Sequence, residues 1–145
     1  MITPITFENL DDCVSAFIKA YNGAPWNYNW TYDKAKQYLS EYMSCGQFVG
    51  FAIYDEGQLV GAILGHTKTW WTNQQLMIDE FFVSSDKQGK GYGKKLLAHC
   101  DIYAAEKGIT TALLMTNKYM PAYNFYNKIG YTAADQYVFM FKQVV

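Results

Sequence analysis

Apolar residues recur at helical spacing early in the chain. Residues 2–7 predict a first strand, and Asn9 or Asp11 then supplies a cap for a helix. The apolar stripe of this helix follows at intervals of three and four residues: Val14, Phe17, Ile18 and Tyr21. Because Asn-Gly-Ala-Pro at residues 22–25 opposes further helix, we expect the helix to end there.

A second helix is predicted after a loop rich in aromatic residues. The loop is Trp26-Asn27-Tyr28-Asn29-Trp30, and Thr31 follows it without the acidic partner of a capping box. The second stripe again has helical spacing: Ala35, Tyr38, Leu39 and Tyr42. Gly46 marks the expected end of this helix.

The middle of the chain changes to patterns typical of strands. Residues 47–54 and 58–68 are rich in β-forming residues, and Asp55-Glu56-Gly57 between them predicts a hairpin turn. A turn at residues 70–73 leads to a further apolar strand, residues 76–83. We therefore expect a meander of three strands.

Two acids, Asp79 and Glu80, interrupt the last strand of this meander. Successive side chains of a regular strand point to opposite faces of a sheet, so at least one acid should face the core or a cleft. An unpaired buried carboxylate is costly, which makes both residues candidates for a functional role. The alternative for each is a salt bridge or a hydrogen bond at a strand bulge.

The final part of the chain alternates between helix and strand patterns. A helical stripe over residues 94–107 ends at Gly108, and an apolar run at 109–115 predicts a strand. Pro121 can open a helix that Gly130 closes, and residues 131–144 predict one or two closing strands. These patterns favour one mixed α/β domain over residues 1–145, with no internal repeat.

Composition narrows the possible partners. The 145 residues are 50% hydrophobic with a net charge of −1, and all twelve basic residues are lysines. The absence of arginine argues against sequence-specific nucleic-acid binding. Three cysteines without a CxxC pair favour reduced thiols and no zinc site, and no signal peptide or long apolar run is present. We therefore expect a cytoplasmic protein that binds neither a metal nor a membrane.

A glycine-rich turn stands between the strand ending at Val83 and the helix beginning near Lys94. Its sequence is Gln88-Gly89-Lys90-Gly91-Tyr92-Gly93, hereafter the cradle. Such a turn can bring backbone N–H groups against a phosphate, where the helix dipole also favours negative charge. The lysines around it, at positions 87, 90, 94 and 95, strengthen the prediction of an anionic partner. The alternative is a tight turn beside an ordinary solvated helix face.

From about residue 47 onward the chain resembles the GNAT superfamily of acetyl-CoA-dependent N-acetyltransferases. The cradle supplies QxxGxG as Gln88, Gly91 and Gly93, and Phe125-Tyr126 follows in the expected order before Gly130-Tyr131. The run at residues 79–83 is also similar to spermidine/spermine acetyltransferases. The resemblance implies an α/β (α+β) fold: a mixed, mostly antiparallel sheet of six or seven strands, flanked by four helices and splayed after the fourth strand.

The resemblance also implies acetyl-CoA as donor. Backbone amides of Gln88, Gly89, Lys90, Gly91, Tyr92 and Gly93 would hold the pyrophosphate, with the side chain of Lys90 or Lys94 assisting. Main-chain groups at Phe81, Phe82 and Val83 would pair with the pantetheine arm. Many members carry asparagine seven residues before the family tyrosine, where this chain has Tyr119, so Asn117 is the candidate for that contact.

For catalysis, an ammonium must lose a proton and the departing thiolate must gain one. Glu80 is the first candidate for the base and Asp79 the second. The resemblance assigns the acid to Tyr126, with packing on the helix as the alternative. Neither histidine is expected to be catalytic, because no serine or cysteine lies in a nucleophile-elbow context and His99 falls in mid-helix.

The expected acceptor is a small-molecule amine. Asp79 and the aromatic residues Trp26, Tyr28 and Trp30 are candidates to bind it, with Trp70 and Trp71 as further candidates, and plain packing is the alternative for the aromatic residues. Polyamines, aminoglycoside-like amines and amino acids all stay open. So do a silent acyl-CoA-binding module, a protein N-terminal or lysine acetyltransferase, and a homodimer.

Overall fold

The structure, a computed structural model, describes residues 1–145. The chain divides into two compact units, Met1–Met115 and Thr116–Val145, and each is described by itself. The first unit contains the sheet, three α-helices and the cradle; the second contains one α-helix.

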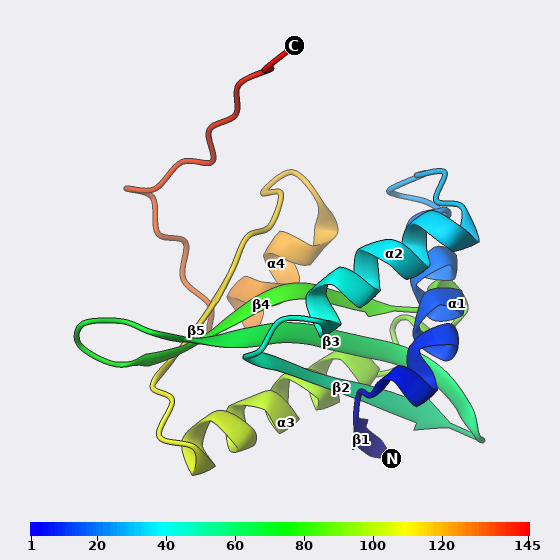
Figure 1. The fold of residues 1–145 in the computed structure, drawn as a ribbon, viewed down its shortest axis with the longest axis horizontal. Helices are drawn as coiled ribbons and strands as arrows, with labels where there is room; N and C mark the ends of the chain where they lie inside the picture. The colour runs from blue at the N-terminus through cyan, green and yellow to red at the C-terminus, as the bar shows by residue number, and fades with distance from the viewer. The chain divides into compact units, whose positions relative to one another are not determined.

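The first unit is built on a five-stranded sheet with the strand order β1-β2-β3-β4-β5 (Figure 1). Its strands are β1 Ile2–Pro4, β2 Phe48–Asp55, β3 Gln58–Thr69, β4 Gln74–Val83 and β5 Thr111–Leu114. The first four run antiparallel to their neighbours, whereas β5 is parallel to β4. The mixed, mostly antiparallel sheet implied by the resemblance is confirmed.

Strand β4 has two local features that matter for function. Its pairing with β5 runs from Gln75 to Ile78 and stops there. Because β5 ends at Leu114, β4 extends beyond its pairing with β5, and the expected splay after the fourth strand stays a prediction. Next to this point β4 contains a bulge: Ile78 lies opposite Gly65 and Glu80 opposite Leu64, so Asp79 is an extra residue with no residue of β3 directly opposite it in the strand register.

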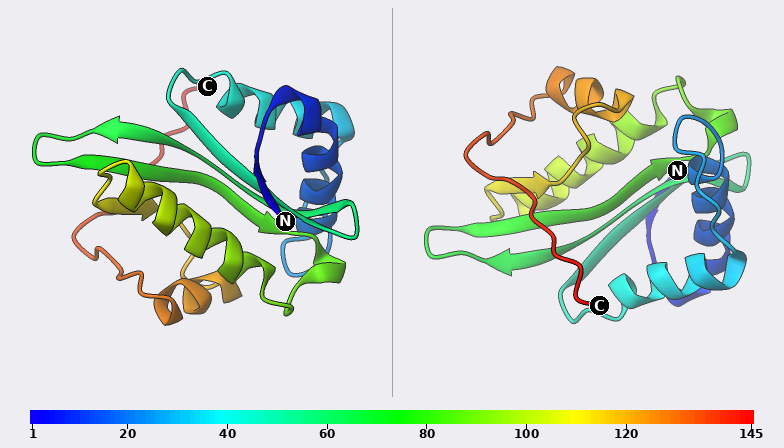
Figure 2. Two further views of the ribbon diagram at one scale, coloured as in Figure 1. Left: turned by 90° about the horizontal axis from the view of Figure 1, so that it is seen from below. Right: turned by 90° about the horizontal axis from the view of Figure 1, so that it is seen from above.

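Helices cover both faces of the sheet. α1 (Leu10–Tyr21) and α2 (Tyr32–Met43) lie on one side and α3 (Tyr92–Glu106) on the other (Figures 1 and 2). Thr31 caps α2, because its hydroxyl accepts a hydrogen bond from the Lys34 N–H at 3.2 Å. Thr6 caps a 3₁₀ turn at Phe7–Asn9 that leads into α1. The structure contains no helix that could span a membrane.

The main core lies between the sheet and the first two helices. Phe17 of α1 and Leu39 of α2 are almost completely buried and pack with Leu64 of β3. On the other face, Phe51 of β2 contacts the rings of His99 and Tyr103 from α3, with ring centroids 4.6 and 5.4 Å apart. The predicted apolar stripes of α1 and α2 therefore face the sheet. On the opposite face of the sheet, His99 of α3 packs against Phe51.

The second unit contains α4 (Pro121–Lys128), which begins at the predicted proline. Residues 131–145 form no strand, so the prediction of closing strands and of six or seven strands in all is wrong. The apolar pattern behind that prediction is real, but residues 137–141 are 74–87% exposed and form no ladder. Apolar alternation favours a strand only where a neighbouring backbone supplies the hydrogen bonds.

Candidate active site

The cradle connects the end of β4 to the start of α3. Gly89 and Gly91 have φ angles of +76° and +86°, which L-residues rarely adopt. Gly91 is the N-cap of α3. A Cβ atom added to either glycine would meet nothing within 4 Å, so the space over both backbones is open.

Two side-chain hydrogen bonds fix the cradle to the sheet. Gln88 Nε2 donates to the Val83 carbonyl at 3.0 Å, and the Tyr92 hydroxyl donates to Asp55 Oδ2 at 2.6 Å. Asp55 closes β2, so Tyr92 ties the first turn of α3 to the β2–β3 hairpin. This bond and burial raise the pKa of Tyr92, which keeps the phenol a proton donor.

The cradle fits an anion such as a pyrophosphate. The first N–H groups of α3 have no partner within the helix, and its first turn contains no acidic side chain. Lys90 and Lys94 are exposed beside the turn, and Lys95 Nζ lies 5.9 Å from the centroid of the Tyr92 ring. Small residues over an open space, unsatisfied donors and lysines together match a phosphate-binding turn.

The bulge in β4 places Asp79 and Glu80, hereafter the acidic pair, on the same face of the sheet. In a regular strand they would point to opposite faces, as we expected from the sequence. Because Asp79 is the extra residue, the alternation resets there and both carboxylates face the side covered by α1 and α2. The expectation of opposite faces is therefore wrong.

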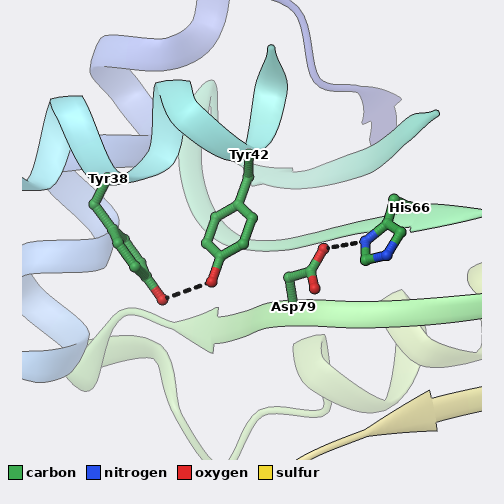
Figure 3. Close-up of polar contacts among 4 residues, drawn as sticks. All are labelled: Tyr38, Tyr42, His66 and Asp79. Atoms are coloured by element: carbon green, nitrogen blue, oxygen red, sulfur yellow. Dashed lines mark hydrogen bonds and ion pairs between the residues drawn. The ribbon is translucent and has the colours of Figure 1, made fainter. Parts of the chain in front are cut away.

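Glu80 is held by tyrosines from both covering helices. Tyr38 of α2 donates to Oε1 at 2.5 Å, and Tyr21 of α1 donates to Oε2 at 3.0 Å. Tyr42 lies 3.2 Å from the Tyr38 hydroxyl (Figure 3). Since the Tyr38 proton is used on Glu80, Tyr42 is the donor in that contact. The result is a hydroxyl chain that ends on a carboxylate.

Opposing effects set the proton affinity of Glu80. Burial raises its pKa, the bonds from Tyr38 and Tyr21 lower it, and the charge of Asp79 raises it again; the net direction is upward. Burial and the bond to Glu80 also raise the pKa of Tyr38, so this phenol remains protonated. Glu80 is thus an oriented carboxylate that is more basic than an ordinary glutamate.

Asp79 pairs with a histidine of the adjacent strand. His66 Nδ1 of β3 lies 2.6 Å from Asp79 Oδ2 (Figure 3), and the two side chains are 28% and 20% exposed. The pair lies on the same face as Tyr38 and Tyr42. Asp79 and Glu80 therefore have different environments: one carboxylate contacts an imidazole and the other contacts phenols.

The aromatic loop is connected to Glu80 through Tyr21. The Tyr21 ring contacts Trp26 and Tyr28, with centroids 5.5 and 6.1 Å apart. Tyr28 is 50% exposed, whereas Trp30 packs against Phe17 and the Tyr38 ring. Trp26 and Tyr28 thus lie beside Tyr21, which donates a hydrogen bond to Glu80. Trp30 instead packs in the core, which is the alternative to a binding role.

The remaining predicted residues of β4 lie directly after the acidic pair. Phe82 is buried and its ring contacts Phe17 at 5.4 Å, so only its main chain is available to a ligand. Phe81 and Val83 are partly buried. Trp70 and Trp71, in the β3–β4 turn, are 53% and 85% exposed.

Tyr126 and Asn117 belong to the second unit. Tyr126 is buried in α4, with its ring 5.7 and 5.6 Å from those of Phe125 and Tyr131. The Asn117 side chain accepts a hydrogen bond from the Tyr119 N–H at 2.9 Å and so shapes the turn before α4. The first unit brings together the cradle, the acidic pair and part of the aromatic loop; these two residues are placed only within their own unit.

Sequence reasoning missed the partners of the acidic pair. Helical spacing predicts only that Tyr21 and Tyr38 belong to the apolar stripes of their helices, and no motif in the sequence points to a role for His66. The available signal was chemical, because a buried tyrosine hydroxyl and a buried carboxylate both need a hydrogen-bond partner. No group of three or more potential metal-ligating side chains occurs in the structure.

Two curated relatives are acetyltransferases. Streptothricin acetyltransferase from Streptomyces lavendulae is 32% identical over 81 residues, 55% of this chain and 42% of that protein. Blasticidin-S acetyltransferase from Streptomyces morookaense is 26% identical over 87 residues, 60% of this chain and 61% of that protein. The alignments thus cover less than two thirds of each relative.

Solved structures share the fold at lower sequence identity. A protein described as a transcriptional regulator from Bacillus halodurans C-125 has a TM-score of 0.80 at 18% identity, with 98% of this chain and 99% of that chain covered. An aminoglycoside N-acetyltransferase in complex with CoA has a TM-score of 0.76 at 14% identity, covering 99% and 94% of the two chains. The sequence profile of the Acetyltransferase (GNAT) family matches residues 11–131, and the chain belongs to this family.

Proposed function

We propose that this chain transfers an acetyl group from acetyl-CoA to a primary amine of a small molecule, by direct attack in a ternary complex. The observation that carries the proposal is the environment of Glu80. This carboxylate is partly buried, held by two tyrosine hydroxyls and made more basic by burial. Such a group suits the removal of a proton from an ammonium.

The donor site follows from the cradle. Backbone N–H groups at residues 88–93 would hold the pyrophosphate, and Lys90 and Lys94 would add positive charge. Main-chain groups of Phe81–Val83 would bind the pantetheine arm, with Asn117 as a further candidate contact. Support comes from the open space over Gly89 and Gly91, from the family membership and from the CoA bound to a structural neighbour.

The chemical step needs two proton transfers. Glu80, directly or through water, takes a proton from the acceptor ammonium. The amine nitrogen attacks the thioester carbonyl carbon, a C–N bond forms, and the C–S bond breaks as the tetrahedral intermediate collapses. Tyr126 supplies the proton to the leaving thiolate, so that an amide and free CoA result. Burial of Tyr126 is compatible with this role and also with packing.

The acceptor class rests on the acidic pair and on the relatives. Two carboxylates beside an aromatic loop favour a cationic ligand. The named substrates of the relatives, streptothricin, blasticidin S and aminoglycosides, are small molecules. Trp26 and Tyr28 would form the wall of the acceptor site next to Tyr21.

The alternative is a module that binds acyl-CoA without turnover. The structural neighbour described as a transcriptional regulator makes it worth testing. Purified protein should be mixed with acetyl-CoA and a panel of polyamines, aminoglycosides, amino acids and peptides, and thiol release should be followed. Turnover on a small amine supports the proposal. Turnover only on peptides indicates a protein acetyltransferase, and CoA binding without any turnover supports the silent module.

A further inference from the structure

The acidic pair is under-compensated in charge. Among residues 1–115, the ion pairs are Lys36–Asp11 and the His66–Asp79 contact. Glu80 is therefore compensated by phenol dipoles and Asp79 by an imidazole. Two carboxylates that share a partly buried face without a lysine create a local negative potential that favours a cation.

The two acids lie in a definite order along β4. The strand leads through Phe81 and Val83 to the cradle, so Asp79 is one residue farther from the cradle than Glu80. If the reacting amine is at Glu80, Asp79 and His66 lie beyond it on the side away from the donor. A group bound there belongs to the remote part of the acceptor.

We propose that the Asp79–His66 pair is a subsite for a second ammonium group, so that the preferred acceptor is a diamine or polyamine. This inference rests on the proposed function, because it takes the reacting amine to be at Glu80. Asp79 supplies the charge, and His66 is a positioning residue. Its Nδ1 contacts Oδ2, which leaves Oδ1 as the acceptor for the ammonium.

The neighbouring groups are compatible with this subsite. Glu80 is adjacent to Asp79 on β4, and the titratable side chains linked to Glu80 by hydrogen bonds are Tyr38 and Tyr42 on α2 and Tyr21 on α1. Tyr38 stays neutral because burial and the Glu80 bond raise its pKa. No side chain of this set provides a positive charge that competes with the ammonium.

The test compares a monoamine with a diamine of the same chain length. Steady-state kinetics with butylamine and 1,4-diaminobutane should be measured for the wild type, Asp79→Asn, His66→Ala and His66→Asn. We expect Asp79→Asn to raise KM for the diamine about 10- to 100-fold with little change for butylamine. His66→Ala should act in the same direction, and His66→Asn should recover part of the loss because its amide can still donate to Oδ2.

Exposed Glu41 on α2 offers a matched control, because Glu41→Gln removes one charge from a carboxylate outside the hydrogen bonds of Glu80 and the Asp79–His66 pair. This variant should leave both KM values unchanged. Equal losses for the monoamine and the diamine in Asp79→Asn would overturn the subsite and indicate a structural role. Thermal unfolding of each variant shows whether it folds.

A binding experiment separates the subsite from the enzymatic activity. Calorimetric titration of the CoA-loaded protein with 1,4-diaminobutane should give a Kd at least tenfold higher in Asp79→Asn than in the wild type. If that difference occurs without turnover on any amine, the proposed activity and the acceptor preference are both wrong, and only diamine binding at Asp79 is supported. If diamine affinity does not depend on Asp79, the subsite is overturned whatever the turnover.

Discussion

Glu80 is the residue on which the proposed chemistry depends most. Its two oxygens accept hydrogen bonds from tyrosines of different helices, which fixes the carboxylate relative to α1, α2 and β4 at once. Burial and the charge of Asp79 raise its pKa against the effect of those bonds. Proton affinity and orientation thus come from the same few contacts.

Glu80→Gln should therefore lower kcat/KM for the amine by about 10²–10⁴-fold, the usual contribution of a general base. Across pH 6–9 the loss should be greatest at the acidic end, where least of the amine is unprotonated. At pH values below the raised pKa of Glu80, the wild type should lose its higher rate relative to Glu80→Gln, because its own carboxylate becomes protonated. A small loss that is uniform over pH would indicate a structural role.

Tyr126 is the residue that we propose as the proton donor to the leaving thiolate. Tyr126→Phe should lower kcat by about 10²–10⁴-fold, because the leaving thiolate would lack its donor. The Kd for CoA should change little, since the phenol acts on the reacting sulfur. Initial rates and CoA titrations on the same protein check both statements, and unaltered turnover over pH 6–9 would remove Tyr126 from the acid role.

At the level of elements, the cradle and the β4 bulge position these residues. The strand-to-helix turn at residues 88–93 was predictable because glycines at such a junction adopt left-handed backbone conformations, whereas its binding of a pyrophosphate stays a prediction. The sequence also predicted the β2–β3 hairpin and the core of β4, because alternation and turn residues are local signals. The bulge was not predicted, since sequence alternation assumes one-to-one pairing between strands, and whether a residue is extra depends on the partner strand.

The cradle prediction concerns Gly91. Gly91→Ala should raise the Kd for CoA about tenfold or more, because the added Cβ enters the open space over the backbone at a φ of +86°. Gly57 is the matched control, with a φ of +76° and nothing within 4 Å of an added Cβ. Gly57→Ala should lower the free energy of unfolding by about as much as Gly91→Ala does, and it should leave the Kd for CoA unchanged. Equal effects on affinity would show that backbone strain alone is responsible.

The bulge prediction concerns Gly65. A Cβ there would lie 2.4 Å from the Met77 carbonyl oxygen, so β3 and β4 must separate beside the bulge. Gly65→Ala should destabilise the protein by about 1–3 kcal/mol and also lower acetyl transfer, because it disturbs the placement of the acidic pair. Chemical denaturation and rate measurements check this. Gly46→Ala, where nothing lies within 4 Å, should change neither property.

At the scale of the whole molecule, the proposed catalytic residues belong to two different units. Glu80 and the cradle lie in Met1–Met115, whereas Tyr126 lies in Thr116–Val145. Glu80 and Tyr126 were both proposed from the order of motifs along the sequence, and the region matched by the GNAT family profile includes both residues. The partners of the acidic pair were not predictable, because Tyr21, Tyr38 and His66 approach it only through tertiary packing.

The exposed apolar run at residues 137–141 shows the same limit of sequence reasoning. Its composition favours a strand, yet the structure gives it no strand partner. Local patterns identified most elements of the first unit. The chemistry of the acidic pair and the absence of a strand at residues 137–141 depend on contacts between distant segments, which local patterns do not report.

The most direct test of the proposed function is thiol release from acetyl-CoA with small amines, accompanied by mass spectrometry of the product. We predict steady turnover with at least one small-molecule amine, a product heavier by one acetyl group, and a large loss of rate in Glu80→Gln at pH 6. CoA binding without acetyl transfer to any amine or peptide would contradict the account.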